Sequence, residues 1–248
     1  MKKITFIAII ASLTSCSTSY FQIYKTQPVN ASTGVAGNVY ENAECRITYD
    51  FWAEGGDAGF TVFNKTSEPL TINMDRSFYI VNGKAYDYYQ ARTFTTSQTE
   101  SKTVYATGYF YRVNLSQAAA SSSGHSTSFE ERPEITIPPK SSKSFSEYII
   151  NPFYFNHCNL AKYPTRRKIK RLNFSVSDSP FVFSNNITYT VGGKTNTLSH
   201  EFYVSELTNL PQSEEIKDVR EQNCDSKRTV RKHVNASPEN FFIRYSKK

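Results

Sequence analysis

Short runs in which apolar and polar residues alternate recur along most of the chain. In Cys45–Trp52 every second residue is apolar, so Cys45, Ile47, Tyr49 and Phe51 are expected to share one face. A period of two is typical of a strand with one face on a core and the other in water. The alternation therefore predicts β-strands as the main elements of the chain.

Turn signals separate these runs at close spacing. Asn82-Gly83 lies between two apolar runs, and Gly192-Gly193 lies between Ile187–Val191 and Thr195–Val204. Both pairs tolerate the positive φ of a two-residue hairpin turn. Roughly ten short strands with turns between them favour a sandwich or barrel. Further strands are expected at residues 20–24, 59–64, 70–74, 103–113, 134–137, 144–150 and 240–245.

Three stretches do not follow this pattern. Gln27–Asn42 is rich in Gly, Asn, Ser and Ala, and Gln117–Glu131 is rich in Ala and Ser, so both are expected to be loops. A helix is predicted only at Gln212–Gln222, where Ile216 and Val219 are one helical turn apart among charged residues. A solvated loop is the alternative for this last stretch.

Composition supports the same fold class. Aromatic residues make up 15% of the chain, with 17 Tyr and 18 Phe, and such residues fit a pleated, half-buried surface. The Asn-containing turns, the Asn82-Gly83 hairpin and the Ile137-Pro138-Pro139 strand end are similar to immunoglobulin-like domains of exported bacterial proteins. The prediction is all-β, a β-sandwich of immunoglobulin-like kind over Cys45–Val204, with at most one short helix near the C-terminus. A fold of this kind implies no particular activity.

The N-terminus has the pattern of an export signal. Lys2 and Lys3 precede the apolar run Ile4–Leu13, which is too short to span a hydrocarbon core of about 30 Å. The ending Leu13-Thr14-Ser15-Cys16 resembles the lipobox of bacterial lipoproteins. The resemblance implies that Cys16 becomes the lipidated first residue of the mature protein, held in a membrane by several acyl chains such as palmitate. An ordinary cleaved signal peptide is the alternative.

These features divide the chain into three parts. Residues 1–15 are expected to be the lipoprotein signal peptide, residues 16–44 the lipid anchor, tether and first strand, and residues 45–248 a single β-sandwich domain. The residue after Cys16 is Ser17, which does not resemble the Asp that retains some lipoproteins in the inner membrane. This favours the outer membrane. Ser17–Tyr20 lacks an acidic surface-export run, so the periplasmic face is favoured over the cell surface.

Three cysteines remain once Cys16 is assigned to lipid. Beyond the inner membrane disulfides are permitted, and three thiols allow one bridge. Cys158 and Cys224 both lie in polar, irregular stretches, so they are the candidate pair. Cys45 opens an apolar strand and is expected to be a small buried hydrophobic residue.

Residue patterns of catalysis or metal binding are not found. The four histidines lack zinc-site spacing, so no metal and no cofactor is expected. Gly193-Lys194-Thr195 ends like a phosphate-binding loop but precedes a predicted strand, which indicates a hairpin turn. No Gly-x-Ser-x-Gly elbow occurs, and four acidic residues that could pair as acid and base are expected to be exposed. The chain is predicted not to be an enzyme. The residues concerned are His125, His157, His200, His233, Asp75, Asp87, Glu130 and Glu131.

Basic residues gather in two clusters. The formal net charge is +7, and removal of residues 1–15 leaves +5. Such clusters attract anionic lipid, polyanionic glycan or nucleic acid, and an exported, anchored protein makes nucleic acid an unsuitable partner. A solubilising loop is the alternative for each cluster. The candidate anion-binding residues are Arg166, Arg167, Lys168, Lys170 and Arg171; the second cluster is Lys227, Arg228, Arg231 and Lys232.

Aromatic runs suggest a second kind of ligand. Tyr86–Tyr89, Tyr109–Tyr111 and Phe153–Phe155 could stack on sugar rings, although alternating strand faces also explain them. The sequence therefore predicts a membrane-anchored envelope lipoprotein with a structural or protein-interaction role and no catalysis, whose partner is another envelope protein. A glycan- or polyanion-binding module of the cell envelope is the alternative function.

Overall fold

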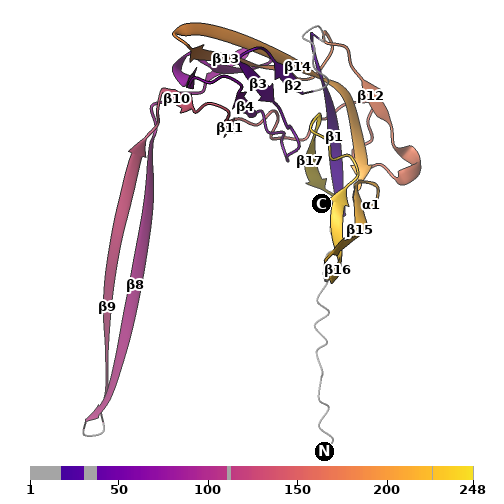
Figure 1. Ribbon diagram of the computed structural model, residues 1–248. Helices are drawn as coiled ribbons and strands as arrows, with labels where there is room; N and C mark the ends of the chain where they lie inside the picture. The colour runs from indigo at the N-terminus through magenta and orange to yellow at the C-terminus, as the bar shows by residue number, and fades with distance from the viewer. Residues whose placement is uncertain (1–17, 31–37, 111–112, 225, 248) are drawn as a thin grey trace, which may run out of the picture.

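The chain folds into two antiparallel sheets that share one hydrophobic core (Figure 1). This computed structural model describes residues 18–30, 38–110, 113–224 and 226–247; within them, only the backbone is described at 96–125, 127 and 223. The predicted signal peptide and Cys16 lie outside the described residues. The all-β prediction is confirmed, and the α-helix found among the described residues, α1 (Gln212–Glu215), lies near the C-terminus.

The larger sheet contains nine strands. Its main path runs β10-β5-β13-β14-β1-β17, while β12 pairs with β14, and β6 pairs with β13 and β7. Its strands are β1 (Ser19–Pro28), β5 (Leu70–Asn73), β6 (Phe78–Val81), β7 (Lys84–Asp87), β10 (Glu134–Ile137), β12 (Arg171–Asn173), β13 (Val182–Val191), β14 (Lys194–Pro211) and β17 (Asn240–Ser246).

The smaller sheet has the order β11-β4-β3-β2. The predicted loop at Gln27–Asn42 thus contains one strand, and the strand expected at residues 144–150 ends early, at Phe145. Residues 31–37 of that loop lie outside the described residues. The strands are β2 (Val39–Glu41), β3 (Cys45–Thr48), β4 (Phe60–Asn64) and β11 (Ser142–Phe145), and the 3-10 helices are η1 (Met74–Arg76) and η2 (Arg166–Lys168).

Aromatic side chains fill the space between the sheets. Cys45, Ile47, Tyr49 and Phe51 are all buried, as their alternation predicted, even though β3 ends at Thr48. The Phe51 ring lies 4.9 Å from that of Phe202 on β14, in an edge-to-face arrangement. Such pairs add to the stability gained from burial alone, because the edge of one ring is attracted to the face of the other.

The two predicted hairpin turns are confirmed. Asn82 and Gly83 join β6 to β7 with φ values of 47° and 78°, and Gly192 and Gly193 join β13 to β14 with φ values of 54° and 75°. Positive φ at both turn residues matches the right-handed twist of the flanking strands. Since β14 follows directly, Gly193-Lys194-Thr195 is part of a hairpin, as the sequence indicated.

The first and last described strands lie side by side. β1 pairs with β14 on one side and with β17 on the other, with Ser19 opposite Ser246. Tyr24 on β1 is fully buried, and its ring stacks on Phe241 of β17 with a centroid distance of 4.3 Å. Strands predicted near both ends of the chain are therefore confirmed, and they complete one sheet.

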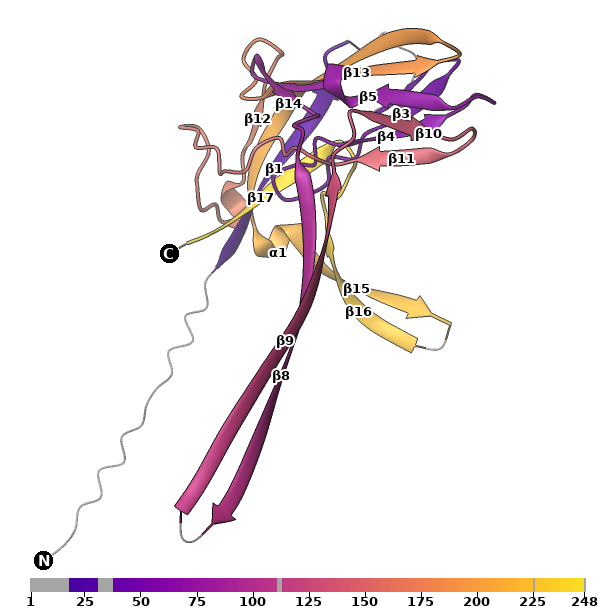
Figure 2. The same cartoon turned by 90° about the vertical axis from the view of Figure 1, so that its left-hand side faces the viewer.

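A long two-stranded arm projects from the sandwich (Figure 2). It consists of β8 (Thr93–Phe110) and β9 (Val113–Glu130), which pair only with each other in the described part of the chain. The loop predicted at Gln117–Glu131 is therefore wrong. Its Ala- and Ser-rich sequence lacks an apolar alternation, and continuous backbone pairing with β8 forms the strand instead. We call this element the long arm.

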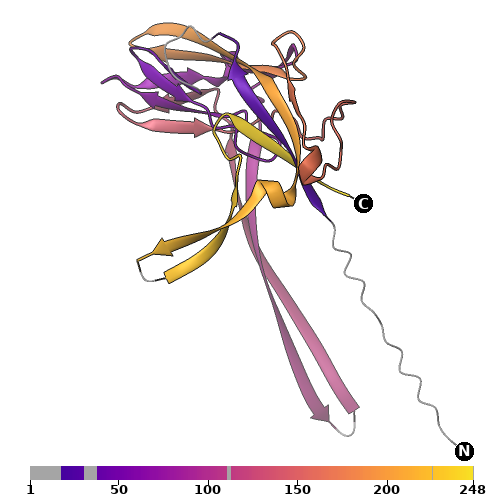
Figure 3. The same ribbon diagram turned by 90° about the vertical axis from the view of Figure 1, so that its right-hand side faces the viewer.

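A shorter hairpin follows α1. β15 (Ile216–Asn223) and β16 (Ser226–His233) pair with each other, so the helix predicted at Gln212–Gln222 is wrong beyond Glu215. The spacing of Ile216 and Val219 fitted a helix, but Val219 lies opposite Val230 and cross-strand pairing determines the structure. We call this hairpin the short arm. Both arms leave the sandwich on the side where β1 begins (Figures 1 and 3).

A buried histidine lies in the core. His200 on β14 is 7% exposed; its Nδ1 lies 2.8 Å from the Tyr49 hydroxyl, and its ring stacks on Tyr40 at 3.7 Å. Burial disfavours the charged imidazolium and lowers the pKa of His200 to about 4 from its ordinary 6.5. The folded protein therefore holds this ring neutral at pH values where the unfolded chain protonates it.

We expect His200 to make the fold sensitive to mild acid. As the pH falls from 6.5 to 4, His200 becomes protonated in the unfolded chain but stays neutral in the folded chain. This difference lowers the free energy of unfolding by up to about 3 kcal/mol. Urea unfolding of the wild type and His200→Gln at several pH values measures this. Between pH 6.5 and 4, the free energy of unfolding of the wild type should fall relative to that of His200→Gln by about 3 kcal/mol. An equal pH dependence of the two proteins would contradict the role of His200.

Candidate functional site

The root of the long arm is held by an ion-pair cluster. Arg92, directly before β8, pairs with Glu131 at 2.5 Å and also with Glu147. The Glu131 carboxylate accepts further hydrogen bonds from the backbone N–H groups of Gln90 and Arg92, at 2.9 and 3.1 Å. These donors, with the Arg92 guanidinium as the largest cause, lower the pKa of Glu131 to about 2. We call Arg92, Glu131 and Glu147 the root clamp.

The root clamp connects the arm to the body. Arg92 directly precedes β8 and Glu131 directly follows β9, so both lie at the root of the arm. There the Glu131 N–H also donates to the Arg92 carbonyl at 2.8 Å. Glu147 comes from the segment after β11. Beside it, the Tyr148 hydroxyl donates to the carbonyl of Asp87, and Gln90 donates to that hydroxyl at 2.9 Å. The arm therefore begins at a fixed position on the sandwich.

An exposed aromatic pair lies next to the root clamp, two residues along each strand of the arm. Phe94 and Phe129 lie opposite each other on β8 and β9, with ring centroids 5.1 Å apart and nearly parallel. Phe94 is 39% exposed and Phe129 is 59% exposed, although rings of this size are usually buried. The Arg92 guanidinium lies 5.4 Å from the Phe94 centroid. The cross-strand register thus presents two stacked rings to solvent.

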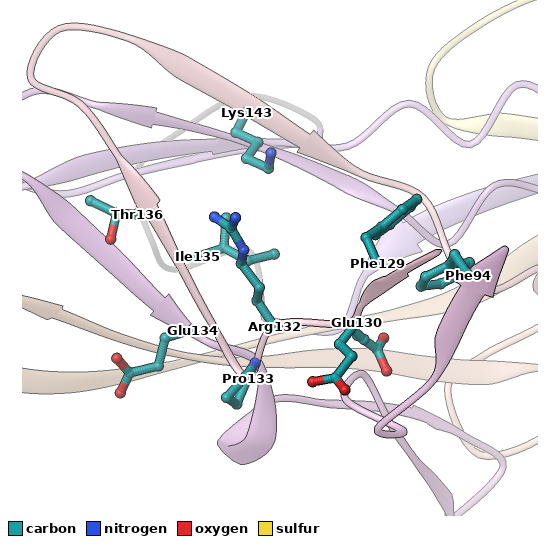
Figure 4. Close-up of a pocket in the computed structure, with 10 residues that line it drawn as sticks. Phe94, Phe129, Glu130, Arg132, Pro133, Glu134, Ile135, Thr136 and Lys143 are labelled. Carbon is teal, nitrogen blue, oxygen red and sulfur yellow. The ribbon is translucent and has the colours of Figure 1, made fainter. Parts of the chain in front are cut away.

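These two rings form one wall of an open cleft of about 1010 Å³ (Figure 4). In this view Lys143 reaches toward the space from above and Arg132 from below, and Ile135 lies beside Arg132. Glu130 and Glu134 add carboxylates at the rim. We call this space the root cleft. It combines an apolar wall with charged groups of both signs.

The root cleft lies at the open edge of the sandwich. β10 ends the path of the larger sheet and β11 ends the smaller sheet, and the chain crosses from one sheet to the other between them. Among the described residues neither strand has a partner on its outer side. Unpaired strand edges offer backbone donors and acceptors to a binding partner.

The predicted anion-binding residues lie around η2 and at the start of β12. Arg166 pairs with Glu214 of α1 at 3.2 Å, and Arg171 pairs with Glu206 at 3.6 Å. Both cationic side chains stay mostly exposed. Among the described residues, Arg167, Lys168 and Lys170 form no ion pair and are exposed. The cluster therefore keeps most of its positive charge.

The second basic cluster is on the short arm, where two carboxylates offset half of its four positive charges. Glu221 on β15 pairs with Lys232 at 2.7 Å and with Arg228 at 3.6 Å, and Asp218 pairs with Arg231 at 3.7 Å. Cross-strand pairing places Arg228 opposite Glu221 and Arg231 opposite Asp218, so their side chains lie close together. The two clusters flank α1, since Arg166 contacts α1 and β15 begins directly after it.

A buried carboxylate fastens the short arm to the body. Glu215 at the end of α1 is fully buried, 2.9 Å from His233 Nδ1 and 2.5 Å from the amide of Asn235. The His233 ring packs against Phe242 and Trp52, at 4.8 and 5.1 Å. Sequence reasoning missed this group, because the acidic run of Glu214 and Glu215 read as a solvated surface.

The aromatic runs have mainly packing roles where side chains are described. Tyr88 is buried, and Tyr86 packs near Tyr79 and Tyr148. Phe153 is 74% exposed, whereas its neighbours Tyr154 and Phe155 pack against the core. The side chains of Tyr109 and Phe110, and the whole of Tyr111, lie outside the described residues. The exposed pair Phe94 and Phe129 was not predicted.

The remaining predicted residues are dispersed. Cys45 is buried, as expected, while Cys158 and Cys224 are exposed free thiols in separate loops, so their pairing stays a prediction. Asp75, Asp87 and Glu130 are exposed; Glu131 belongs to the root clamp. His157 is half-buried in a loop, and the side chain of His125 is outside the described residues. These residues do not come together in one site.

No group of three or more His, Cys, Asp or Glu side chains in the described ranges is placed to hold a metal ion. Within the same ranges, no helix has the length and apolar character needed to cross a membrane.

We expect Arg92→Ala to loosen the root of the long arm. Loss of the guanidinium removes hydrogen bonds between charged groups, each contributing about 1.5–3 kcal/mol, and lets the Glu131 pKa return toward its ordinary value. Amide hydrogen exchange at residues 90–94 and 129–132 should then accelerate. In the wild type the same root should loosen as the pH falls from 4.5 toward 2, because protonation of Glu131 ends its ion pair.

Arg132→Ala is the matched control, because Arg132 is exposed and forms no ion pair among the described residues. It should leave exchange at the root unchanged. Equal exchange in the two variants would show that the root clamp does not hold the arm.

Comparisons with known proteins do not assign a family. No protein-family model matches the chain, and no curated protein matches it. Among solved structures the chain is similar to one titled "Crystal structure of lysenin pore", at 10% sequence identity and a TM-score of 0.13. The match covers 88% of this chain and 63% of that one, so this chain spans under two thirds of its length. A TM-score this low carries no argument about fold or function.

Proposed function

We propose that this protein is a lipid-anchored protein of the bacterial envelope that binds another envelope protein through the root cleft, without catalysis. The N-terminal Leu13-Thr14-Ser15-Cys16 pattern supports the anchor, since it resembles a lipobox. The outer membrane, its periplasmic face and the immunoglobulin-like kind of sandwich belong to this proposal as well. They rest on Ser17 and on the turn motifs already described.

One observation carries the interaction role: the exposed stacked pair of Phe94 and Phe129 in the root cleft. Protein interfaces have apolar, aromatic centres and polar rims, and a few aromatic residues supply most of their binding energy. The root cleft has this arrangement, because Arg132 and Lys143 line it together with the rings. The outer edges of β10 and β11 beside it add backbone groups for a partner strand.

The root clamp makes this surface suitable for binding. Arg92 holds the arm at its root and also lies over the Phe94 ring. A surface whose geometry is fixed before binding loses less entropy when a partner arrives. The ion pairs at the root therefore support the aromatic pair directly.

The anchor is tested by mass spectrometry of the mature protein. We expect the N-terminal peptide to begin at Cys16 and to carry the added mass of a diacylglyceryl group, with the protein retained in the membrane fraction at high salt. Cys16→Ser should remove that mass and release the chain from acyl anchoring. A mature terminus elsewhere, without acyl mass, would refute the anchoring proposal.

The interaction role is tested with Phe94→Ser combined with Phe129→Ser. Loss of two interface rings should weaken capture of the partner from envelope extracts by about a thousandfold, since hot-spot residues contribute at least 2 kcal/mol each and about 1.4 kcal/mol is a factor of ten. Quantitative cross-linking of the wild type and the variant measures this. Phe153→Ser is the control, because Phe153 is 74% exposed but lies outside the root cleft. Equal capture by all three proteins would exclude the root cleft.

A further inference from the structure

A cluster of tyrosines surrounds the start of β1. The Tyr20 ring lies 5.2 Å from Tyr163 and 5.7 Å from Tyr245, and Tyr154 lies 4.6 Å from Tyr245. Tyr20, Tyr163 and Tyr245 are half-buried, so part of each ring reaches solvent. Three segments far apart in the sequence thus place aromatic rings together at one end of the larger sheet.

Lysine side chains border this cluster. Lys162 Nζ lies 5.2 Å from the Tyr154 ring and 5.7 Å from that of Tyr163, while Lys247 Nζ lies 5.9 Å from the Tyr163 ring. Both lysines are exposed. Half-buried tyrosines with cations beside them match the residues found at membrane–water interfaces, where amphipathic rings lie at headgroup level.

Positive charge extends away from the cluster without acidic residues in the same segment. The stretch from Asn159 to Arg171 contains six Lys or Arg residues and no Asp or Glu, and four of the six, at 162, 167, 168 and 170, form no ion pair among the described residues. A cationic surface of this kind complements an anionic leaflet. We call Tyr20, Tyr163, Tyr245, Lys162, Arg167 and Lys247 the anchor-end surface.

The path of the chain links this surface to Cys16. β1 begins at Ser19, and Thr18 accepts a hydrogen bond from the N–H of Lys247 at 3.2 Å. Only three residue steps separate Cys16 from Ser19, which allows at most about 10 Å. A lipid attached at Cys16 therefore keeps the start of β1 within that distance of the headgroups.

We propose that the anchor-end surface rests on the anionic headgroups of the bilayer that holds the protein, a proposal that depends on the lipid anchoring of Cys16. The tyrosines lie among the headgroups and the lysines and Arg167 contact lipid phosphates. This contact gives the anchored protein one orientation relative to the bilayer. The opposite end of β14, at Lys194, lies farthest from the bilayer.

Fluorescent probes on Thr165, in the basic segment beside the anchor-end tyrosines, and on Lys194, at the far end of β14, test this orientation. β14 spans Lys194–Pro211, about 55 Å along the strand, and Pro211 lies opposite Tyr20. Labels on Thr165→Cys and on Lys194→Cys, in a Cys158→Ser and Cys224→Ser background, report each end; Cys45 is buried and stays unlabelled. The mature, acylated protein is placed in phosphatidylcholine vesicles containing phosphatidylglycerol and a headgroup-linked quencher.

We expect strong quenching at Thr165→Cys and little at Lys194→Cys. Each cation near an anionic leaflet strengthens association about fivefold, so Lys162→Gln, Arg167→Gln and Lys247→Gln together should weaken the contact about a hundredfold and remove the difference. High salt, or vesicles of phosphatidylcholine alone, should also reduce the difference in quenching between the two probes. The control combines Arg76→Gln, Lys84→Gln and Lys140→Gln, which neutralises three exposed cations elsewhere and should preserve the difference.

Flotation at high salt separates the two proposals. A protein that fails to float with vesicles and lacks acyl mass on Cys16 would refute the anchoring proposal and, with it, this one. A protein that floats but shows equal quenching at both probes, or no change in the triple variant, would overturn the orientation and leave the anchor intact.

Discussion

The buried side-chain amide of Gln22 on β1 connects the larger sheet to the irregular segment around Phe155, which belongs to neither sheet. Its Nε2 donates to the Phe155 carbonyl and to Asn209 at 2.8 and 3.0 Å, and its Oε1 accepts from Tyr24 and from the Phe155 N–H at 2.5 and 2.8 Å. Every donor and acceptor of the amide is thus satisfied at zero exposure. Since a buried unpaired group costs about 1–3 kcal/mol, the irregular segment around Phe155 is held against β1.

The elements that could be predicted are those whose own side chains determine their structure. The alternation from Cys45 to Phe51 identifies a buried face, and Asn82-Gly83 defines a turn, because both signals are local. The short arm could not be predicted, since Val219 opposite Val230 requires knowledge of the partner strand. Local sequence favoured a helix there, and tertiary pairing outweighed that preference.

The root cleft illustrates why exposed surface features are harder to predict than cores. Phe94 and Phe129 are far apart in the sequence and become a pair only through the register of β8 and β9. A signal did exist, because one Phe stands at each end of a Ser- and Thr-rich stretch that contains no proline. The basic residues around Arg167 could be predicted as a cluster, whereas the contact of the nearby Tyr163 with Tyr20 depends on the fold.

The place of β1 has a consequence for the order of folding. Ser19 lies opposite Ser246, so the interior strand of the larger sheet acquires its second neighbour only when the last residues of the chain are present. Long-range pairing of this kind slows folding, because the entropy of closing the chain is lost before the contacts form. A newly made chain therefore cannot complete this sheet until β17 has been synthesised.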